Sequence, residues 1–304
     1  MNLNVYYDLN FAPVTFDFAV FLVVSNAVRQ EIGAESMSVE IICNQFRNWS
    51  VREKNSSTET KRWRVSNILS KLPFLIPETK SLKINEKGLD SITFPSFPGG
   101  YPPPNAVSKE YRMPYLVKDL KHFYNKSINL RPFKASKGAK NFISNLFDQN
   151  TVTISLRTSA FQSARNSNLS EWHKVYLRLQ ETKYRPIVIP DFEDFMGDKI
   201  FKKFDWEIFE PAIFDLDLRM ALYERSFDNL AINNGTTSLL NFSNCSYKEF
   251  KLVTSGIPTT EVAHHKLNFD ISYGENFKFC NPQNQLIIWE DDTSDTILSR
   301  LEYI

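Results

Sequence analysis

The feature that most constrains the fold is a strand–helix–strand pattern that occurs in both halves of the chain. In the first half, strand-forming residues at 3–7 precede an apolar helical stretch at 16–30, and a second strand-forming run follows at 38–43. In the second half the pattern restarts at the β-branched run 151–156. A helical crossover between successive strands favours a parallel sheet, which binds ligands at the carboxyl ends of its strands.

Weaker patterns supply the remaining elements. Residues 46–60 are polar and predict a loop, and the final helix is compatible with a return to the first half. Helices are predicted at 62–75, 115–124, 139–147, 170–182, 217–226 and 295–301, and strands at 186–189, 229–233, 250–254 and 285–289.

A segment dense in proline and glycine, 94–104, separates the two halves. Proline lacks an amide donor and glycine weakens regular structure, so this segment excludes a regular helix or a central strand. We therefore predict an α/β protein with two Rossmann-like domains, residues 1–150 and 151–304, whose parallel sheets face an interdomain cleft.

Composition excludes several classes of protein. The 36 Lys and Arg balance 35 Asp and Glu, which removes any global electrostatic reason to expect a nucleic-acid partner. No apolar run approaches the roughly 18 residues that a membrane span needs, and residues 18–24 lack the flanks of a signal peptide. Cys43, Cys245 and Cys280 have no zinc-site or disulfide spacing. A cytoplasmic protein without a transmembrane segment is predicted.

Arg157 and Arg165 lie in the loop that follows the first strand of the second half, just before a helix. Guanidinium groups bind phosphate oxygens through paired donors, and a helix N-terminus adds backbone N–H groups. The pattern therefore indicates a phosphate site. In the alternative interpretation, both arginines are solvated or pair with Asp191, Glu193 or Asp194.

A second candidate anion site follows the strand predicted at 229–233. Asn234, Gly235, Thr236 and Thr237 combine a glycine with consecutive hydroxyls before an apolar stretch. Glycine permits a positive φ and a close approach of backbone to ligand, and the threonines offer hydroxyl and N–H donors. An ordinary Asn-Gly turn is the alternative.

The pair Asp215 and Asp217 matches the DxD pattern of metal-dependent sugar transferases, but three-residue matches are frequent by chance. We predict that Asp217 caps the following helix and that Asp215 interacts with its dipole. No metal site is expected. The chain also lacks G-x-S-x-G, GxGxxG and Walker A sequences, which argues against a hydrolase, a dinucleotide dehydrogenase and a P-loop kinase.

Taken in order, the arginine loop, VIPD at 188–191, RMALYE at 219–224 and NNG at 233–235 resemble the donor-binding half of a GT-B glycosyltransferase, and are similar to the heptosyltransferases. That family has a basic residue after the first strand of its C-terminal domain. It also has a strand that ends in Asp-Thr-Gly, followed by a helix beneath the donor diphosphate. This chain departs from the pattern with Asn-Gly-Thr at 234–236 and no histidine after it.

The first half resembles the same architecture, because Asp8 ends a predicted strand and Asp17 stands at the start of the next helix. Family members have a catalytic carboxylate in this region. The resemblance therefore implies that Asp17, with Asp8 as the second candidate, is the general base that deprotonates an acceptor hydroxyl. In the alternative interpretation, Asp17 only favours the helix N-terminus.

The resemblance implies a metal-independent glycosyltransferase of polysaccharide biosynthesis. It would move a sugar from a nucleoside diphosphate sugar, its co-substrate, to a glycan or other hydroxyl acceptor, with no further cofactor. Arg157, Arg165 and the backbone of 234–237 would stabilise the diphosphate as it leaves. Two alternatives remain open: a non-catalytic protein that binds nucleotide or glycan, and a sugar-nucleotide epimerase.

Overall fold

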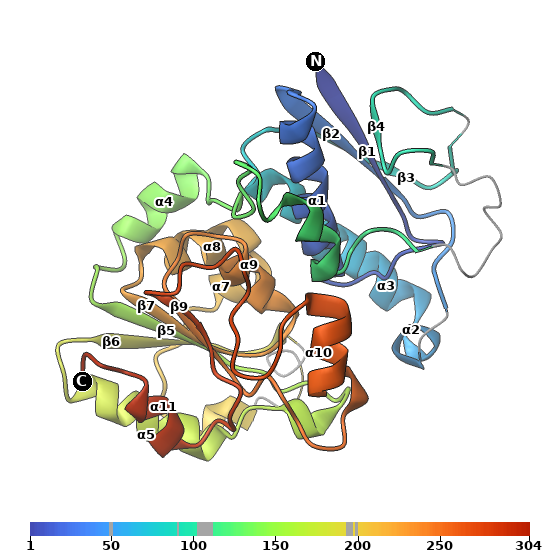
Figure 1. Ribbon diagram of the computed structural model, residues 1–304. Coiled ribbons are helices and arrows are strands. Elements are labelled where there is room, and N and C mark those ends of the chain that lie inside the picture. The colour runs from blue at the N-terminus through green and yellow to red at the C-terminus, as the bar shows by residue number, and fades with distance from the viewer. Residues whose placement is uncertain (49–50, 90, 102–111, 193–196, 198–199) are drawn as a thin grey trace. The chain divides into compact units, whose positions relative to one another are not determined.

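The computed structural model describes residues 1–48, 51–89, 91–101, 112–192, 197 and 200–304 (Figure 1). The chain divides into two compact units, Met1–Phe133 and Lys134–Ile304. Helix α4 (Lys137–Ser144) packs on α8 (Leu216–Arg225), so the residues just before the sequence-predicted boundary at 150/151 belong to the second unit.

The first unit contains a parallel sheet in the order β3-β2-β1-β4. Helix α1 is apolar on nearly every side and lies against this sheet, with Phe18 and Phe21 packed on Tyr7 of β1. The elements are β1 (Asn2–Asp8), α1 (Asp17–Glu31), β2 (Ser36–Ile42), α2 (Val51–Asn55), α3 (Thr58–Arg64), a π-helix (Val65–Leu69), a 3-10 helix (Leu72–Leu75), β3 (Thr79–Asn85), β4 (Ser96–Phe97) and a 3-10 helix (Val117–Phe123).

The second unit contains a parallel sheet in the order β6-β5-β7-β8-β9. Its helices and strands are α4, β5 (Thr151–Ser155), α5 (Leu169–Gln180), β6 (Arg185–Ile189), α7 (Pro211–Phe214), α8, β7 (Asp228–Ile232), α9 (Ser238–Asn241), β8 (Tyr247–Phe250), α10 (Val262–Phe269), β9 (Gln285–Ile287) and α11 (Ser294–Ser299). Short 3-10 turns are present at Ser163–Arg165, Ile200–Lys203, Gly235–Thr237 and Pro258–Thr260.

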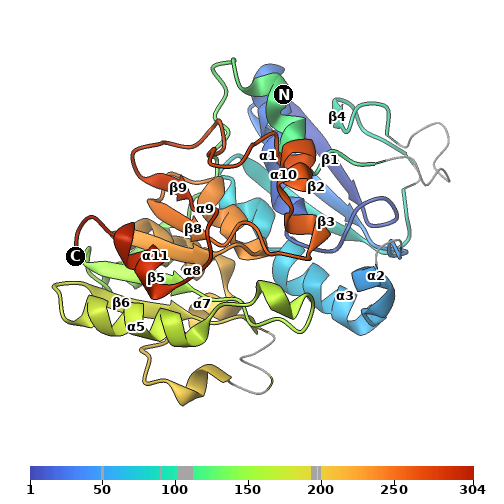
Figure 2. The ribbon, with the colours of Figure 1, turned by 60° about the horizontal axis from the view of Figure 1, so that its bottom comes forward.

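Alternation along β5 explains how helices cover both faces of the second sheet. Val152 and Ile154 belong to the apolar core that includes the buried face of α5. Thr153 and Ser155 point to the opposite face, where Ser155 Oγ lies 2.8 Å from Tyr223 Oη of α8. Figures 1 and 2 show α5 beside α11, and Figure 1 shows α8 on the other side of the sheet. The prediction of parallel α/β sheets is confirmed.

Both strand orders contain a point at which successive crossovers leave in opposite directions. In the first sheet β1 lies between β2 and β4, and in the second sheet β5 lies between β6 and β7. Parallel α/β folds bind ligands at the carboxyl edge of the sheet beside such a point. The strand order therefore predicts ligand-binding residues in the loops that follow β1, β5 and β7.

Three local predictions were wrong. The strand expected at 250–254 is β8, which ends at Phe250 because Lys251 adopts a left-handed conformation with a φ of 57°. The loop expected at 46–60 contains α2 and the start of α3, whose cap is Ser57. Helix α11 does not return to the first unit, because it packs on α5.

The segment rich in proline and glycine, 94–104, was predicted to contain no central strand. This prediction is confirmed for residues 94–101, which the structure describes. Ser96–Phe97 forms β4, a two-residue strand at the edge of the first sheet. Within the described ranges, no helix is long and apolar enough to cross a membrane.

The central position of β5 gives a stability prediction. Ile154 is 1% exposed and belongs to the core of the second unit. Ile154→Ala should therefore lower the free energy of unfolding by about 2–4 kcal/mol, through lost apolar burial and the cavity left behind. Urea unfolding followed by tryptophan fluorescence measures the change. Leu177→Ala on α5 is the control, because Leu177 is 46% exposed; equal losses in both variants would contradict the assigned core.

Candidate functional site

Two loops meet at the carboxyl edge of the second sheet, one after β5 and one after β7. The β5 loop carries Arg157 and Arg165, and the β7 loop carries Asn233 and the turn 234–237. Since β5 and β7 are hydrogen-bonded neighbours in parallel register, both loops begin at the same edge. The sheet therefore brings together the two anion-binding candidates, which are nearly 70 positions apart in the sequence.

Arg157 holds its own loop in shape. The side chain is buried, and its guanidinium donates to the carbonyl oxygen of Gln162 at 3.2 Å and also to Phe161 O and Asn166 Oδ1. Asn166 Oδ1 in turn accepts the backbone N–H of Ser159 at 3.0 Å. These contacts assign Arg157 a role in loop conformation. In the alternative interpretation, acidic residues pair with the arginines of this loop. Two of these residues, Glu193 and Asp194, lie outside the part of the chain that the structure describes.

Arg165 joins the two loops. Its Nη2 donates to Asn233 Oδ1 at 2.8 Å and to Asn233 O at 3.3 Å, and its Nη1 donates to Gln162 Oε1 at 3.1 Å. The side chain is half-buried, in contrast to Arg157. Gln162 has a φ of 52° and its side-chain amide reaches Thr259 Oγ1 at 3.2 Å, in the loop after β8. Arg165 is therefore the arginine of this loop that solvent reaches.

The turn after β7 is closed by the side chain of Asn234. Its Oδ1 accepts the N–H groups of Thr236 at 2.8 Å and Thr237 at 3.2 Å, and the Thr236 hydroxyl at 2.6 Å. Gly235 begins the 3-10 turn and is exposed. An oxygen acceptor therefore already occupies the position in which the two amides converge, as a phosphate oxygen could.

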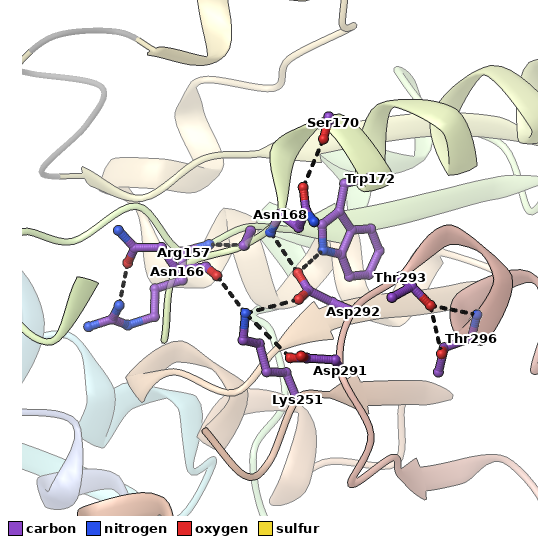
Figure 3. A network of polar contacts seen from close by, with 11 residues as sticks. Arg157, Asn166, Asn168, Ser170, Trp172, Lys251, Asp291, Asp292, Thr293 and Thr296 are labelled. Carbon is purple, nitrogen blue, oxygen red and sulfur yellow. Dashed lines mark hydrogen bonds and ion pairs between the residues drawn. The ribbon is translucent and has the colours of Figure 1, made fainter. Parts of the chain in front are cut away.

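A buried network next to the site was missed by sequence reasoning (Figure 3). Lys251 Nζ donates to Asn166 O and to Asp292 Oδ1, both at 3.1 Å. Asp292 is 2% exposed, and its Oδ2 accepts the backbone N–H of Asn168 at 2.7 Å and Trp172 Nε1 at 2.9 Å. One carboxylate thus caps α5 and, through Lys251, anchors the end of the arginine loop.

The charge of Arg165 acts on three further titratable groups, Glu249, His264 and His265. Burial raises the pKa of Glu249, a residue of β8, and the charge of Arg165 is among the influences that oppose this shift. Burial lowers the pKa of His264 on α10, and the positive charge of Arg165 lowers it further. Burial also lowers the pKa of His265, whose Nε2 lies 3.1 Å from Leu252 O. Burial and the charge of Arg165 thus lower the pKa of both histidines.

In the first unit, Asp8 ends β1 and is buried. Its carboxylate accepts the backbone and side-chain N–H groups of Asn10, both at 2.8 Å, and the hydroxyl of Tyr101. Burial raises the pKa of Asp8, and these hydrogen bonds act in the opposite direction. The contacts show that Asp8 closes the turn that leaves the strand.

Asp17 is the first residue of α1 and is partly exposed. Thr15 Oγ1 donates to Asp17 Oδ2 at 2.6 Å. Burial is the main cause of the raised pKa of Tyr7, and the negative charge of Asp17 is the next. Asp17 also acts on Tyr115, whose pKa is raised mainly by burial and whose hydroxyl accepts from Arg47. The carboxylate of Asp17 therefore lies among phenol groups at the carboxyl edge of the first sheet.

The DxD pair has a structural explanation, with the two roles exchanged relative to the prediction. Asp215 is the N-cap of α8, and its Oδ1 accepts the N–H groups of Asp217 at 2.8 Å and Leu218 at 3.0 Å. Asp217 accepts the amide and hydroxyl of Ser136 at 2.7 and 2.6 Å. In the part of the chain that the structure describes, no three His, Cys, Asp or Glu side chains gather to hold a metal ion.

The solved structures that are similar to this chain include three glycosyltransferases. They are the glycosyl transferase family 9 protein from Veillonella parvula DSM 2008 (TM-score 0.44, 9% identity, 82% of this chain and 80% of that one), the E. coli heptosyltransferase WaaC with ADP (0.47, 8%, 99% and 97%), and E. coli ADP-heptose lps heptosyltransferase II (0.47, 12%, 82% and 84%). No protein-family model matches the chain. No curated protein matches it. Similarity at these identities and TM-scores carries no information about the reaction of this chain.

The left-handed backbone of Lys251 predicts that an alanine variant is less stable than a glycine variant at this position, the reverse of the usual order. Both Lys251→Ala and Lys251→Gly remove the contacts to Asn166 and Asp292, but alanine keeps the left-handed strain, which costs roughly 1–2 kcal/mol in an L-residue. Lys251→Ala should therefore be less stable than Lys251→Gly in urea unfolding. At Lys174, within the helix α5, the order should be the normal one, with glycine less stable than alanine. Glycine less stable at both positions would contradict the prediction.

Proposed function

We propose that the chain is a metal-independent glycosyltransferase that takes a sugar from a nucleoside diphosphate sugar and transfers it to a hydroxyl acceptor. The second unit binds the diphosphate through Arg165 and the turn 234–237. In the first unit, Asp17 is the general base. The nucleoside diphosphate sugar is the co-substrate.

The observation that carries the proposal is the contact between Arg165 and Asn233. It brings a partly exposed guanidinium beside a turn whose amides converge on an oxygen atom, at the carboxyl edge where the direction of the crossovers changes. A guanidinium and converging amides are the donors that bind phosphate oxygens best. A diphosphate would replace the side-chain oxygen of Asn234 or bind beside it.

The proposed reaction transfers charge to the diphosphate. The acceptor oxygen forms a bond to the anomeric carbon while the bond between that carbon and the diphosphate oxygen breaks. The hydroxyl proton passes to the carboxylate of Asp17, and the bonding electrons leave with the diphosphate. Donors fixed in place before the reaction, here Arg165 and the turn amides, stabilise this developing charge without reorganising. Because Asp215 and Asp217 bind amide and hydroxyl groups, they support a proposal in which no DxD motif binds metal.

A panel of UDP-, GDP-, ADP- and CMP-linked sugars tests the proposal. Calorimetry identifies the base, and product analysis with and without acceptors identifies the reaction. Binding with transfer to an acceptor supports the transferase. Binding without turnover supports a binding protein, conversion without acceptor supports an epimerase, and no binding of any member of the panel overturns the proposal.

The two arginines should respond differently to alanine substitution. Arg165→Ala should weaken diphosphate binding at least about tenfold, since charge-assisted contacts contribute roughly 1.5–3 kcal/mol. Arg157→Ala should instead lower the free energy of unfolding by about 2 kcal/mol or more, because it removes a buried guanidinium that donates to Phe161 O, Gln162 O and Asn166 Oδ1. Calorimetry and urea unfolding measure the two effects. Arg178→Ala, on the exposed face of α5, is the control, and donor affinity unchanged in Arg165→Ala would remove Arg165 from the site.

Substitution of the two carboxylates of the first unit should have different effects on turnover. Asp17→Asn keeps the shape and removes the base, so turnover should fall by roughly 10²–10⁴-fold with donor binding retained. Asp8→Asn should keep most of the turnover, because its amide oxygen still accepts from Asn10 and its amide nitrogen can donate to the hydroxyl oxygen of Tyr101. Steady-state kinetics with saturating donor measures both. Full activity in Asp17→Asn would transfer the role to Asp8 or exclude a carboxylate base.

A further inference from the structure

Glu249 is a buried carboxyl group behind the candidate diphosphate site. It lies on β8, next to β7 in the sheet, and is 1% exposed. Its Oε1 accepts Asn233 Nδ2 at 2.6 Å and lies 3.1 Å from the hydroxyl of Thr237. Oε1 of Glu249 therefore contacts two parts of the β7 loop. These are Asn233, which binds Arg165, and Thr237, which ends the turn.

The contact with Asn233 determines which side of its amide faces Arg165. A side-chain amide has donors on its nitrogen and acceptor sites on its oxygen, so a partner for one side orients the other. Because Nδ2 donates to Glu249, Oδ1 faces the guanidinium of Arg165 and accepts from it at 2.8 Å. Without an acceptor at position 249 the amide could rotate and present its nitrogen to the arginine, which also has only donors.

The contact with Thr237 acts on the turn. Thr237 Oγ1 lies 2.7 Å from Asn234 O and 3.1 Å from Glu249 Oε1, so its single proton is donated to one of these two acceptors. Thr237 is itself buried. The position of Glu249 therefore limits the movement of the turn whose amides converge on Asn234.

We propose that Glu249 is a positioning residue that orients Asn233 and the turn 234–237, and thereby places Arg165 for binding of a diphosphate. The inference rests on the proposed function of this edge of the sheet. Glu249 does not touch the ligand. It acts through Asn233 and Thr237.

The energetics of burial agree with such a role. Burial raises the pKa of Glu249, while hydrogen bonds from Asn233, Asn241 and Thr237 and the charge of Arg165 oppose this shift. A buried carboxyl group costs stability compared with a well-packed apolar side chain. Such a costly group beside loops that carry an arginine and converging amides is typical of a functional site.

Calorimetric titration with ADP and with inorganic pyrophosphate tests the inference. Glu249→Leu fills a similar volume without an acceptor, and we expect it to weaken binding of both probes about tenfold, whereas Glu249→Gln keeps an acceptor oxygen and should bind within a few-fold of the unchanged protein. The double variant Glu249→Leu/Arg165→Ala should lose clearly less affinity than the sum of the two single losses, because part of the effect of Glu249 is exerted through Arg165. Additive losses, or full affinity in Glu249→Leu, would overturn the proposal. Glu181→Ala, exposed at the end of α5, is the control for a distant carboxylate.

Hydrogen exchange separates this inference from the proposed function. If the unchanged protein binds neither probe nor any nucleotide sugar, the proposed function fails, but positioning can still be measured. In Glu249→Leu the amides of 233–237 and 162–166 should exchange faster, while those of β5 keep their protection. The same result is expected for Thr237→Val at 234–237. Unchanged exchange in these segments would show that Glu249 positions nothing.

Discussion

Parallel pairing of β5 with both β6 and β7 determines where the polar groups of the second unit lie. In a parallel sheet every strand ends at the same edge, and the crossovers on either side of β5 leave in opposite directions. The loops after β5 and β7 therefore begin side by side and diverge. Arg165 reaches Asn233 because of this arrangement, and the contacts of Glu249 and Lys251 follow from it, since β8 is the next strand.

The loops at this edge are held by buried charge. Arg157 satisfies carbonyl groups inside its own loop, and Asp292 accepts from Asn168, Trp172 and Lys251. Each of these groups is costly to bury unless it is fully hydrogen-bonded. In return, each restricts a segment without regular secondary structure. Electrostatic catalysis needs donors that are fixed before charge develops, so a framework of this kind suits the proposed chemistry.

The first unit uses related means at its own edge. Asp8 closes the turn after β1, as Asn234 closes the turn after β7. Asp17 follows at the start of α1, where its charge acts on the phenols of Tyr7 and Tyr115. The buried carboxylate thus shapes the backbone, and the partly exposed one is the base of the proposed reaction. In the second unit, Arg157 and Arg165 divide the same two roles.

The sequence by itself determined the fold class and most element positions, because periodicity and β-branched runs are local signals. It also placed Asp8 at the end of a strand, and Asp17, Arg157, Arg165 and the turn 234–237 after strands. It could not distinguish Arg157 from Arg165, or predict that β8 ends at Phe250, because burial and the left-handed backbone of Lys251 depend on contacts with distant segments. Glu249 and Asp292 carried no local signal, since an acidic residue in a strand or turn is ordinarily solvated. Only the tertiary structure, which brings β7, β8 and the residues after β9 against the arginine loop, decided that these carboxyl groups are buried and which donors they hold.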